Sequence, residues 1–183
     1  AGSTSPLVRQ LQGATTTPII VCGSTVEGEE PMVLDALRVV QRRFPDALLI
    51  LAPRHPERFQ SVVDLLASSG MPFWRRSQWS GARIHRGGVF LLDTIGELAD
   101  VYQLADVAFI GGSVVPRGGH NVLEAARFGI PIIVGPYMEN FRDMMNVFIP
   151  AQAVLISNPG HLGEHIDGLL ADPALARARG ARA

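Results

Sequence analysis

The sequence of 183 residues contains no lysine, because all sixteen of its basic residues are arginine. A Walker A phosphate loop and a Schiff base both require a lysine, so both kinds of site are excluded. The single cysteine, Cys22, excludes an internal disulfide and a zinc site built from several cysteines. Without a disulfide to protect, a reducing compartment is the default expectation.

Long apolar runs and an excess of charge are also absent. No run approaches the roughly 18 apolar residues of a membrane span, and the N-terminus lacks the regions of a signal peptide, so we expect a soluble chain. The formal net charge of -1 provides no basic field for a nucleic acid, and none is predicted as a partner. We interpret the local basic spot at Arg75 and Arg76 as a solvated face.

Short runs rich in Val, Ile and Leu alternate with longer amphipathic runs, which is typical of β-α units around a parallel sheet. We expect strands at residues 18–22, 47–52, 72–75, 88–92, 107–111, 131–134 and 153–156. We expect helices at 29–44, 57–69, 96–104, 121–128, 141–148, 161–170 and 173–179. Because crossovers between parallel strands are right-handed, the predicted fold class is α/β, a Rossmann-like doubly wound parallel sheet.

One domain is predicted, at residues 18–183, since 47% of the chain is hydrophobic and its length suits a single core. Residues 1–17 show little periodicity, and we interpret them as an irregular lead-in or a remnant of cloning. The final ARARGARA carries no helix stop signal. We therefore expect a domain excised from a longer protein.

Ligands of doubly wound sheets bind beyond the carboxyl ends of the strands, so the loops that follow the strands are the candidate sites. In the first such loop, Ser24 or Thr25 is expected to cap a helix, and Glu29 and Glu30 to complement its dipole. This loop lacks the G-x-G-x-x-G pattern of dinucleotide binding. The sequence therefore argues against a nicotinamide or flavin enzyme, and no cofactor is predicted.

Two further loops carry polar residues at strand ends. In PRHPERF, flanking prolines stiffen the backbone around Arg54, whose guanidinium suits a phosphate; a solvated arginine before a Pro-initiated helix is the equal alternative. In DTIGEL, Asp93 or Thr94 is expected to cap a helix. The backbone from Thr94 to Gly96 would then line a pocket for a base.

The stretch GGSVVPRGGHNVLEAARFGIPIIVGP, Gly111 to Pro136, combines six glycines with several hydrogen-bonding side chains. Gly118 and Gly119 lead into a predicted helix whose free N–H groups favour a phosphate. Asn121 can cap that helix, whereas the carboxylate of Glu124 can accept from two ribose hydroxyls. The stretch thus indicates a phosphorylated, ribose-bearing ligand. The structural alternative for Glu124 is a buried ion pair with Arg117 or Arg127.

Together, STVEGEE, PRHPERF, DTIGEL and GGSVVPRGGHNVLEAARFGIPIIVGPYMENFRD resemble, in order and spacing, the C-terminal half of a 3-deoxy-D-manno-octulosonic acid (Kdo) transferase. The resemblance runs from about Ile19 to about Leu170. The string from Gly111 to Asn121 is highly specific for that family. Val122 departs from the family's usual proline and Tyr137 from its frequent histidine. The first departure puts the start of the following helix in doubt, and the second any role for that side chain.

The resemblance implies one half of a GT-B glycosyltransferase, in which two Rossmann-like domains face each other and the C-terminal one holds CMP-Kdo. Such enzymes transfer Kdo with inversion to a lipid A precursor at the cytoplasmic face of the inner membrane, without a metal ion at the transfer step. Their catalytic carboxylate lies in the N-terminal domain, which this chain lacks. The resemblance therefore implies a soluble donor-binding fragment without catalytic residues, inactive by itself.

Carried over by resemblance, the donor-binding residues are Arg54, Gly96, Gly112, Ser113, Arg117, Gly118, Gly119, Asn121, Glu124 and Asn140. Two of these roles stay open. Arg117 either binds the donor carboxylate or pairs with an acid, and Asn140 either faces the donor or caps a helix. A GT-B transferase using another nucleotide sugar, or an epimerase-like module, is the alternative function.

Overall fold

The computed structural model describes residues 5–15, 18–84 and 86–183. Within these residues, seven strands form one parallel sheet in the order β3-β4-β2-β1-β5-β6-β7. The strands are β1 (Ile19–Thr25), β2 (Leu48–Pro53), β3 (Phe73–Arg75), β4 (Gly88–Leu91), β5 (Val107–Ile110), β6 (Ile132–Val134) and β7 (Val154–Ile156). Each overlaps a predicted strand, and the predicted Rossmann-like fold class is confirmed.

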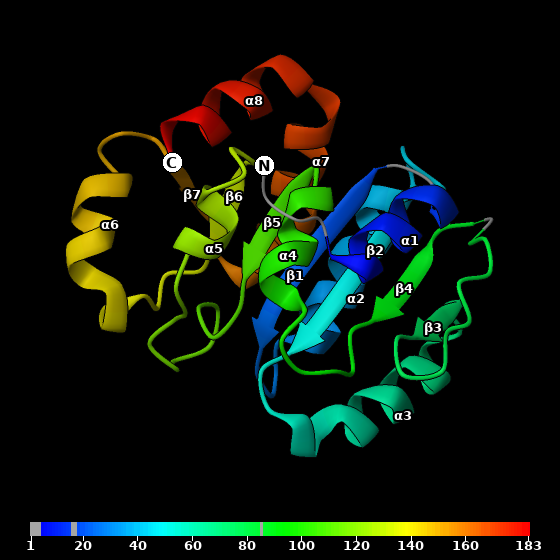
Figure 1. The fold of residues 1–183 in the computed structure, drawn as a ribbon. Coiled ribbons are helices and arrows are strands. Elements are labelled where there is room, and N and C mark those ends of the chain that lie inside the picture. Colours follow the sequence, from blue (N-terminus) through cyan, green and yellow to red (C-terminus); the bar gives the residue numbers. More distant parts are fainter. Residues whose placement is uncertain (1–4, 16–17, 85) are drawn as a thin grey trace.

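The helices cover both faces of the sheet. They are α1 (Pro6–Ala14), α2 (Glu30–Gln41), α3 (Phe59–Ser69), α4 (Leu98–Val101), α5 (Leu123–Ala126), α6 (Arg142–Phe148), α7 (Leu162–Ala171) and α8 (Pro173–Arg182), with 3-10 turns η1 (Pro56–Arg58), η2 (Tyr102–Leu104), η3 (Glu139–Phe141) and η4 (Pro159–His161). Residues of α1, α4, α5 and α6 contribute to one core and residues of α2, α3, α7 and α8 to the other. In Figure 1, α1, α4 and α5 lie in front of the sheet.

Strand residues alternate between the two cores, as the pleat requires. Val21 of β1 and Ile110 of β5 enter the core under α1, whereas Cys22 and Phe109 enter the core under α2. Because both faces are covered, the strands are continuous apolar runs rather than alternating ones. This is why their positions could be read directly from the sequence.

The expected irregular lead-in is wrong where the structure describes it. Residues Pro6–Ala14 form α1, capped by Ser5, whose hydroxyl accepts from the N–H of Val8 at 3.2 Å. Leu7, Val8 and Leu11 are buried, so the helix belongs to the core. The Ser-Pro start signal was present, but a nine-residue helix shows too little periodicity to reveal itself. Residues 1–4, 16 and 17 of the lead-in lie outside the described residues.

The order of the strands reverses between β1 and β5. From β1 the chain moves outward through β2, and it later returns to place β5 on the other side of β1. The arrowheads of β1, β2 and β4 point to the same, lower edge in Figure 1. A crevice at such a switch point, outside the carboxyl ends, is where doubly wound sheets bind their ligands.

Candidate functional site

A hollow of about 400 Å³ lies at this edge. Its lining residues come from the end of β1 and from the segments that follow β2, β4, β5 and β6: Ser24, Arg54, Gly96, Leu98, Ala99, His120, Asn121, Glu124 and Phe141. The structure thus brings together four of the predicted site residues, Arg54, Gly96, Asn121 and Glu124. A guanidinium, an imidazole and a carboxylate share one small space.

Arg54 is held by its backbone. Its N–H donates to the carbonyl of Thr25 at 2.8 Å, which joins the loop after β2 to the end of β1. Further along the same loop, Arg58 forms an ion pair with Glu30, which is only 1% exposed. Burial raises the pKa of Glu30 despite the neighbouring Arg58. The loop is therefore tied down on both sides of Arg54, while the Arg54 side chain itself is exposed.

Glu124 is exposed, so the alternative of a buried ion pair is not observed. No ion pair of Glu124 with Arg117 or Arg127 occurs among the described residues, and Arg127 instead lies over the ring of Phe128, 4.5 Å from its centroid. Burial, followed by the charge of Glu124, raises the pKa of Tyr102. Among the described residues, no group forms a hydrogen bond or an ion pair with the Glu124 carboxylate. The carboxylate is therefore available to a ligand.

Asn121 accepts a backbone hydrogen bond at the start of α5, which is the structural role considered for it. Its Oδ1 accepts from the N–H of Leu123 at 2.9 Å, just before α5. The predicted helix at 121–128 is wrong in length, since α5 spans only Leu123–Ala126. Positive φ angles at Gly118, Gly119 and Gly129 limit the helix on both sides. The helix after the glycines is therefore shorter than predicted, and a phosphate at its N-terminus stays a prediction.

Glu29 has a role that the sequence did not reveal. Its buried carboxylate accepts hydrogen bonds from the N–H groups of Val26 (3.0 Å), Gly112 (2.7 Å), Ser113 (3.2 Å) and Val114 (3.1 Å). The side chain therefore joins the loop after β1 to the loop after β5, across the switch point. It was predicted only to complement a helix dipole. The N–H groups of Gly112 and Ser113, two residues of the predicted donor loop, therefore donate to Glu29.

Ser113 also points into the molecule. It is fully buried, its hydroxyl donates to the carbonyl of Ile110, and the N–H of Gly135 donates to the same hydroxyl at 2.9 Å. The carbonyl of Ser113 accepts from the N–H of Tyr137 at 2.8 Å. The hydrogen bonds of the Ser113 side chain connect the loops after β5 and β6, and the place of Ser113 in the donor site stays a prediction.

Gly118 and Gly119 close the loop after β5. Both have φ of +81°, and Gly119 donates its N–H to the carbonyl of Gly112 at 2.8 Å. The N–H of Asn140 donates to the carbonyl of Gly118 at 3.0 Å, and a Cβ on Gly118 would clash with the Asn140 side chain. Among the described residues no side-chain hydrogen bond caps η3 or α6, so the helix-cap alternative for Asn140 is not observed. These glycines shape the loop and leave it little tolerance for a side chain.

Arg117 lies outside the set of residues that line the hollow, and its side chain is exposed. The ion pairs of the described residues include no acid beside it, so the alternative of an acid partner is not observed. A contact with the carboxylate of a donor stays a prediction.

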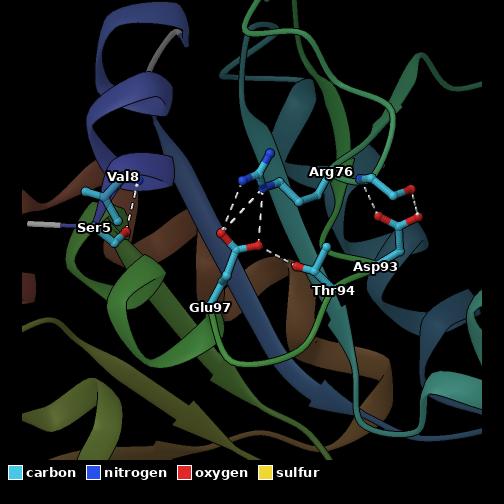
Figure 2. Close-up of polar contacts among 7 residues, drawn as sticks. Ser5, Val8, Arg76, Asp93, Thr94 and Glu97 are labelled. Atoms are coloured by element: carbon cyan, nitrogen blue, oxygen red, sulfur yellow. Dashed lines mark hydrogen bonds and ion pairs between the residues drawn. The ribbon is translucent and has the colours of Figure 1, made fainter.

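The acidic residues of the loop after β4 do not cap a helix but accept hydrogen bonds from other side chains and from the backbone. Asp93 accepts from Arg75 Nε at 3.0 Å and from the N–H of Ser77 at 2.8 Å. Figure 2 shows Glu97 accepting from Arg76 and from Thr94. Although burial acts to raise it, the hydrogen bonds of Ser77 and Arg75 hold the pKa of Asp93 below its ordinary value.

The expected cap by Asp93 or Thr94 is therefore wrong. Arg75 and Arg76 are half-buried partners of acids rather than a solvated face. Both pairings join residues at least sixteen positions apart, out of reach of a local capping rule. The network anchors the loop that carries Gly96 to the end of β3.

Two polar residues that line the hollow, Ser24 and His120, were not among the predicted site residues. Ser24 was expected as a cap, and Thr25 with it, but both belong to β1. Ser24 has φ of +57°, an unusual conformation for a side-chain-bearing residue, at an irregularity of the β1–β2 pairing. No role was predicted for His120. Its position in GGHN, beside Asn121, was the available signal.

A larger hollow of about 560 Å³ lies at the opposite edge, at the amino ends of the strands, and includes Pro18, Asp106 and Pro131 in its lining. The carboxylate of Asp106 is already engaged, because it accepts from the N–H of Ile19 at 2.8 Å. In this fold the carboxyl ends are the binding edge. We therefore assign the site to the smaller hollow.

Two features are absent from the described residues, a membrane-spanning helix and a cluster of metal ligands. None of the helices in that part of the chain is both long and apolar enough to cross a membrane. Nor do three or more His, Cys, Asp or Glu side chains gather there as ligands for a metal ion.

No protein-family model matches the chain. A 3-deoxy-D-manno-octulosonic acid transferase of Bordetella pertussis is 39% identical over 170 residues, covering 91% of this chain and 40% of that protein. A second, of Haemophilus influenzae, is 40% identical over 141 residues, covering 77% of this chain and 33% of that protein. The chain thus spans less than half the length of these curated relatives.

The crystal structure of the C-terminal CMP-Kdo binding domain of WaaA from Acinetobacter baumannii superimposes with a TM-score of 0.87 and 33% identity. The match covers 96% of this chain and 92% of that domain. The similarity therefore extends over almost the whole of both folds.

Proposed function

The chain belongs to the Kdo transferase family, and from this premise we propose that it forms the part of such an enzyme that binds the CMP-activated Kdo donor. The likeness to a CMP-Kdo binding domain supports this proposal. The observation that carries it is the hollow at the switch point, where Arg54 and the carboxylate of Glu124 lie in the same lining. Such a space suits a ligand with a phosphate and a ribose.

In the proposed complex, Arg54 binds the phosphate through its guanidinium, which donates two parallel hydrogen bonds. Glu124 accepts from the ribose hydroxyls, and the loop around Gly96 lies beside the base. Asn121, Gly118 and Gly119 shape the loop, while Arg117 and Asn140 are candidates for the sugar. Gly112 and Ser113 support the site from beneath it, because Glu29 and the loop after β6 already bind them.

For the longer protein we propose transfer of Kdo from CMP-Kdo to a lipid A precursor, with inversion, at the cytoplasmic face of the inner membrane. A GT-B partner domain would supply the acceptor side and the catalytic base. The present chain would then bind the donor without transferring the sugar, because the base must be positioned against the donor.

Competition among nucleotides tests the proposed donor. CMP should bind the chain more tightly than UMP or GMP, as measured by calorimetric titration. A transferase or an epimerase-like module that uses another nucleotide sugar shares the ribose and the phosphate but differs in the base. Equal or tighter binding of UMP or GMP would therefore favour that alternative.

Glu124 should determine the preference for ribose. A carboxylate accepts from the 2′ and 3′ hydroxyls together, so wild type should prefer CMP over 2′-deoxy-CMP by about 1 to 3 kcal/mol. Glu124→Gln should narrow this gap, and Glu124→Ala should nearly close it. Calorimetric titration of both nucleotides into each protein measures the gap.

Melting curves provide the control for this prediction. Because Glu124 is exposed, its alanine variant should melt close to wild type. Glu164→Ala, at an exposed position of α7, should leave both the discrimination and the melting temperature unchanged. Undiminished discrimination by Glu124→Ala, or a large fall in its melting temperature, would remove Glu124 from the ribose site.

A further inference from the structure

His120 lies in the lining of the same hollow as Arg54 and Glu124. Its imidazole packs against Gly112: a Cβ on that glycine would stand 2.7 Å from Nε2 and 2.8 Å from Cδ2. Gly112 also has φ of +69°, which disfavours any side chain there. Because Gly112 has no side chain, the imidazole ring fits against its backbone. This packing holds the ring at the site.

This ring makes no hydrogen bond within the described part of the protein. Its Nε2 is buried and has no partner there. Buried polar atoms are normally paired, and exceptions call for an explanation. The neighbouring Asn121 and Gly119 are explained by the fold, since each makes a hydrogen bond that shapes the loop. No hydrogen bond of this kind accounts for the His120 side chain.

The charges around His120 favour an anion. Arg54 and His55 face it from the loop after β2, and the one negative group among the described residues that line the hollow is Glu124 on α5. Burial, followed by Arg54 and His55, lowers the pKa of His120 below its ordinary value of 6.5. An anion placed between Arg54 and the ring would offset that repulsion and stabilise the imidazolium.

We propose that His120 binds the phosphoryl group of the donor together with Arg54, and takes up a proton from solvent as the donor binds. The inference rests on the proposed function, because it assigns a second anion-binding group to the same site. No covalent bond changes in this step. The imidazole gains a proton, and the resulting cation lies against the phosphoryl oxygens.

The direction of the pH dependence follows from linkage. Free His120 has a depressed pKa, and a bound phosphoryl anion raises it. Affinity is therefore lowest above the pKa of the complex, strengthens as the pH falls through that value, and levels off below the pKa of the free protein. The gain is about tenfold for each unit by which the pKa rises on binding.

A phosphodiester is the right probe for this effect. The phosphate of CMP has a second pKa of about 6, which would add its own pH dependence. The methyl ester of CMP keeps a single negative charge across this range, and cytidine lacks the phosphate. Both should be titrated into wild type between pH 5.5 and about 8, the range in which histidine changes its charge.

Wild type should bind the ester more tightly at low pH, by about tenfold or more over this range if the pKa rises by one unit or more. Cytidine affinity should not change with pH. His120→Gln should bind the ester with little pH dependence, whereas the control His161→Gln, at an exposed position outside the lining of the hollow, should keep it. Titration of the imidazole by NMR should show the pKa of His120 rising when the ester is added to wild type, which requires no variant.

Three results are decisive against the inference. If wild type binds the ester with no pH dependence, or His120→Gln keeps the wild-type dependence, the role of His120 is wrong while the proposed donor stands. An NMR titration in which the pKa of His120 does not rise would likewise show that the role of His120 is wrong while the proposed donor stands. If neither the ester nor CMP binds wild type at any pH, the proposed function fails, and the role of His120 fails with it.

Discussion

Replacing Glu29 by alanine should lower the free energy of unfolding by about 3 to 6 kcal/mol and abolish measurable CMP binding. Its carboxylate accepts from the N–H groups of Val26, Gly112, Ser113 and Val114. A buried donor that loses its acceptor costs about 1 to 3 kcal/mol. The losses do not add fully, because water can enter the space that alanine leaves.

The loss of binding should follow from the loss of loop geometry. Without Glu29, the loop that carries His120 and Asn121 is no longer fixed to the end of β1. A binding site depends on side chains that the surrounding structure holds in place. Glu29→Gln should also destabilise the fold. The NH2 group of its amide is a donor, and it would face backbone N–H groups that need an acceptor.

Urea denaturation and CMP titration of these variants measure both effects. The matched control is Glu27, which lies in the same loop and is exposed. Glu27→Ala should change the stability by less than about 0.5 kcal/mol and leave CMP binding intact. A Glu29→Ala variant as stable as Glu27→Ala would show that the hydrogen bonds at Glu29 contribute nothing to the fold.

Arg54→Ala should weaken CMP binding by about tenfold to a hundredfold, because a hydrogen bond to a charged group contributes about 1.5 to 3 kcal/mol. Cytidine binding should stay almost unchanged, since cytidine has no phosphate. Arg54 is exposed and has no ion pair among the described residues, so its removal should not disturb the fold.

Calorimetric titration of CMP and cytidine into both proteins measures the difference. Arg42→Ala is the matched control, because Arg42 is exposed at the far end of α2. It should bind both ligands like wild type. An equal loss of affinity for CMP and cytidine in Arg54→Ala would mean that the residue supports the fold of the loop rather than the phosphate.

The convergence of Arg54, Gly96, Asn121 and Glu124 could be predicted because it depends only on strand order. Buried apolar runs located the strands, and the residues after them share an edge in any parallel sheet. Glu29 could not be read in this way. Its acceptor role joins it to Gly112, 83 positions away, whereas the local pattern suggested a helix terminus.

Asp93 and Ser113 show the same limit. A local rule assigned Asp93 to a cap, and the resemblance placed Ser113 in the donor loop. In the structure, Asp93 binds Arg75 and Ser113 binds the loop after β6. A polar side chain takes the partner that the tertiary fold brings to it, and sequence spacing does not reveal that partner. In contrast, α1 was missed although its Ser5 cap is local, because the helix is short.

A crystal structure of the chain with CMP tests the central claim most directly. The account predicts CMP in the hollow at the carboxyl ends of β1 and β5, with its phosphate against Arg54 and its ribose hydroxyls against Glu124. CMP bound in the hollow beside Asp106 at the opposite edge would contradict that assignment. Crystals soaked at a saturating concentration of CMP that hold no nucleotide would contradict the proposed donor itself.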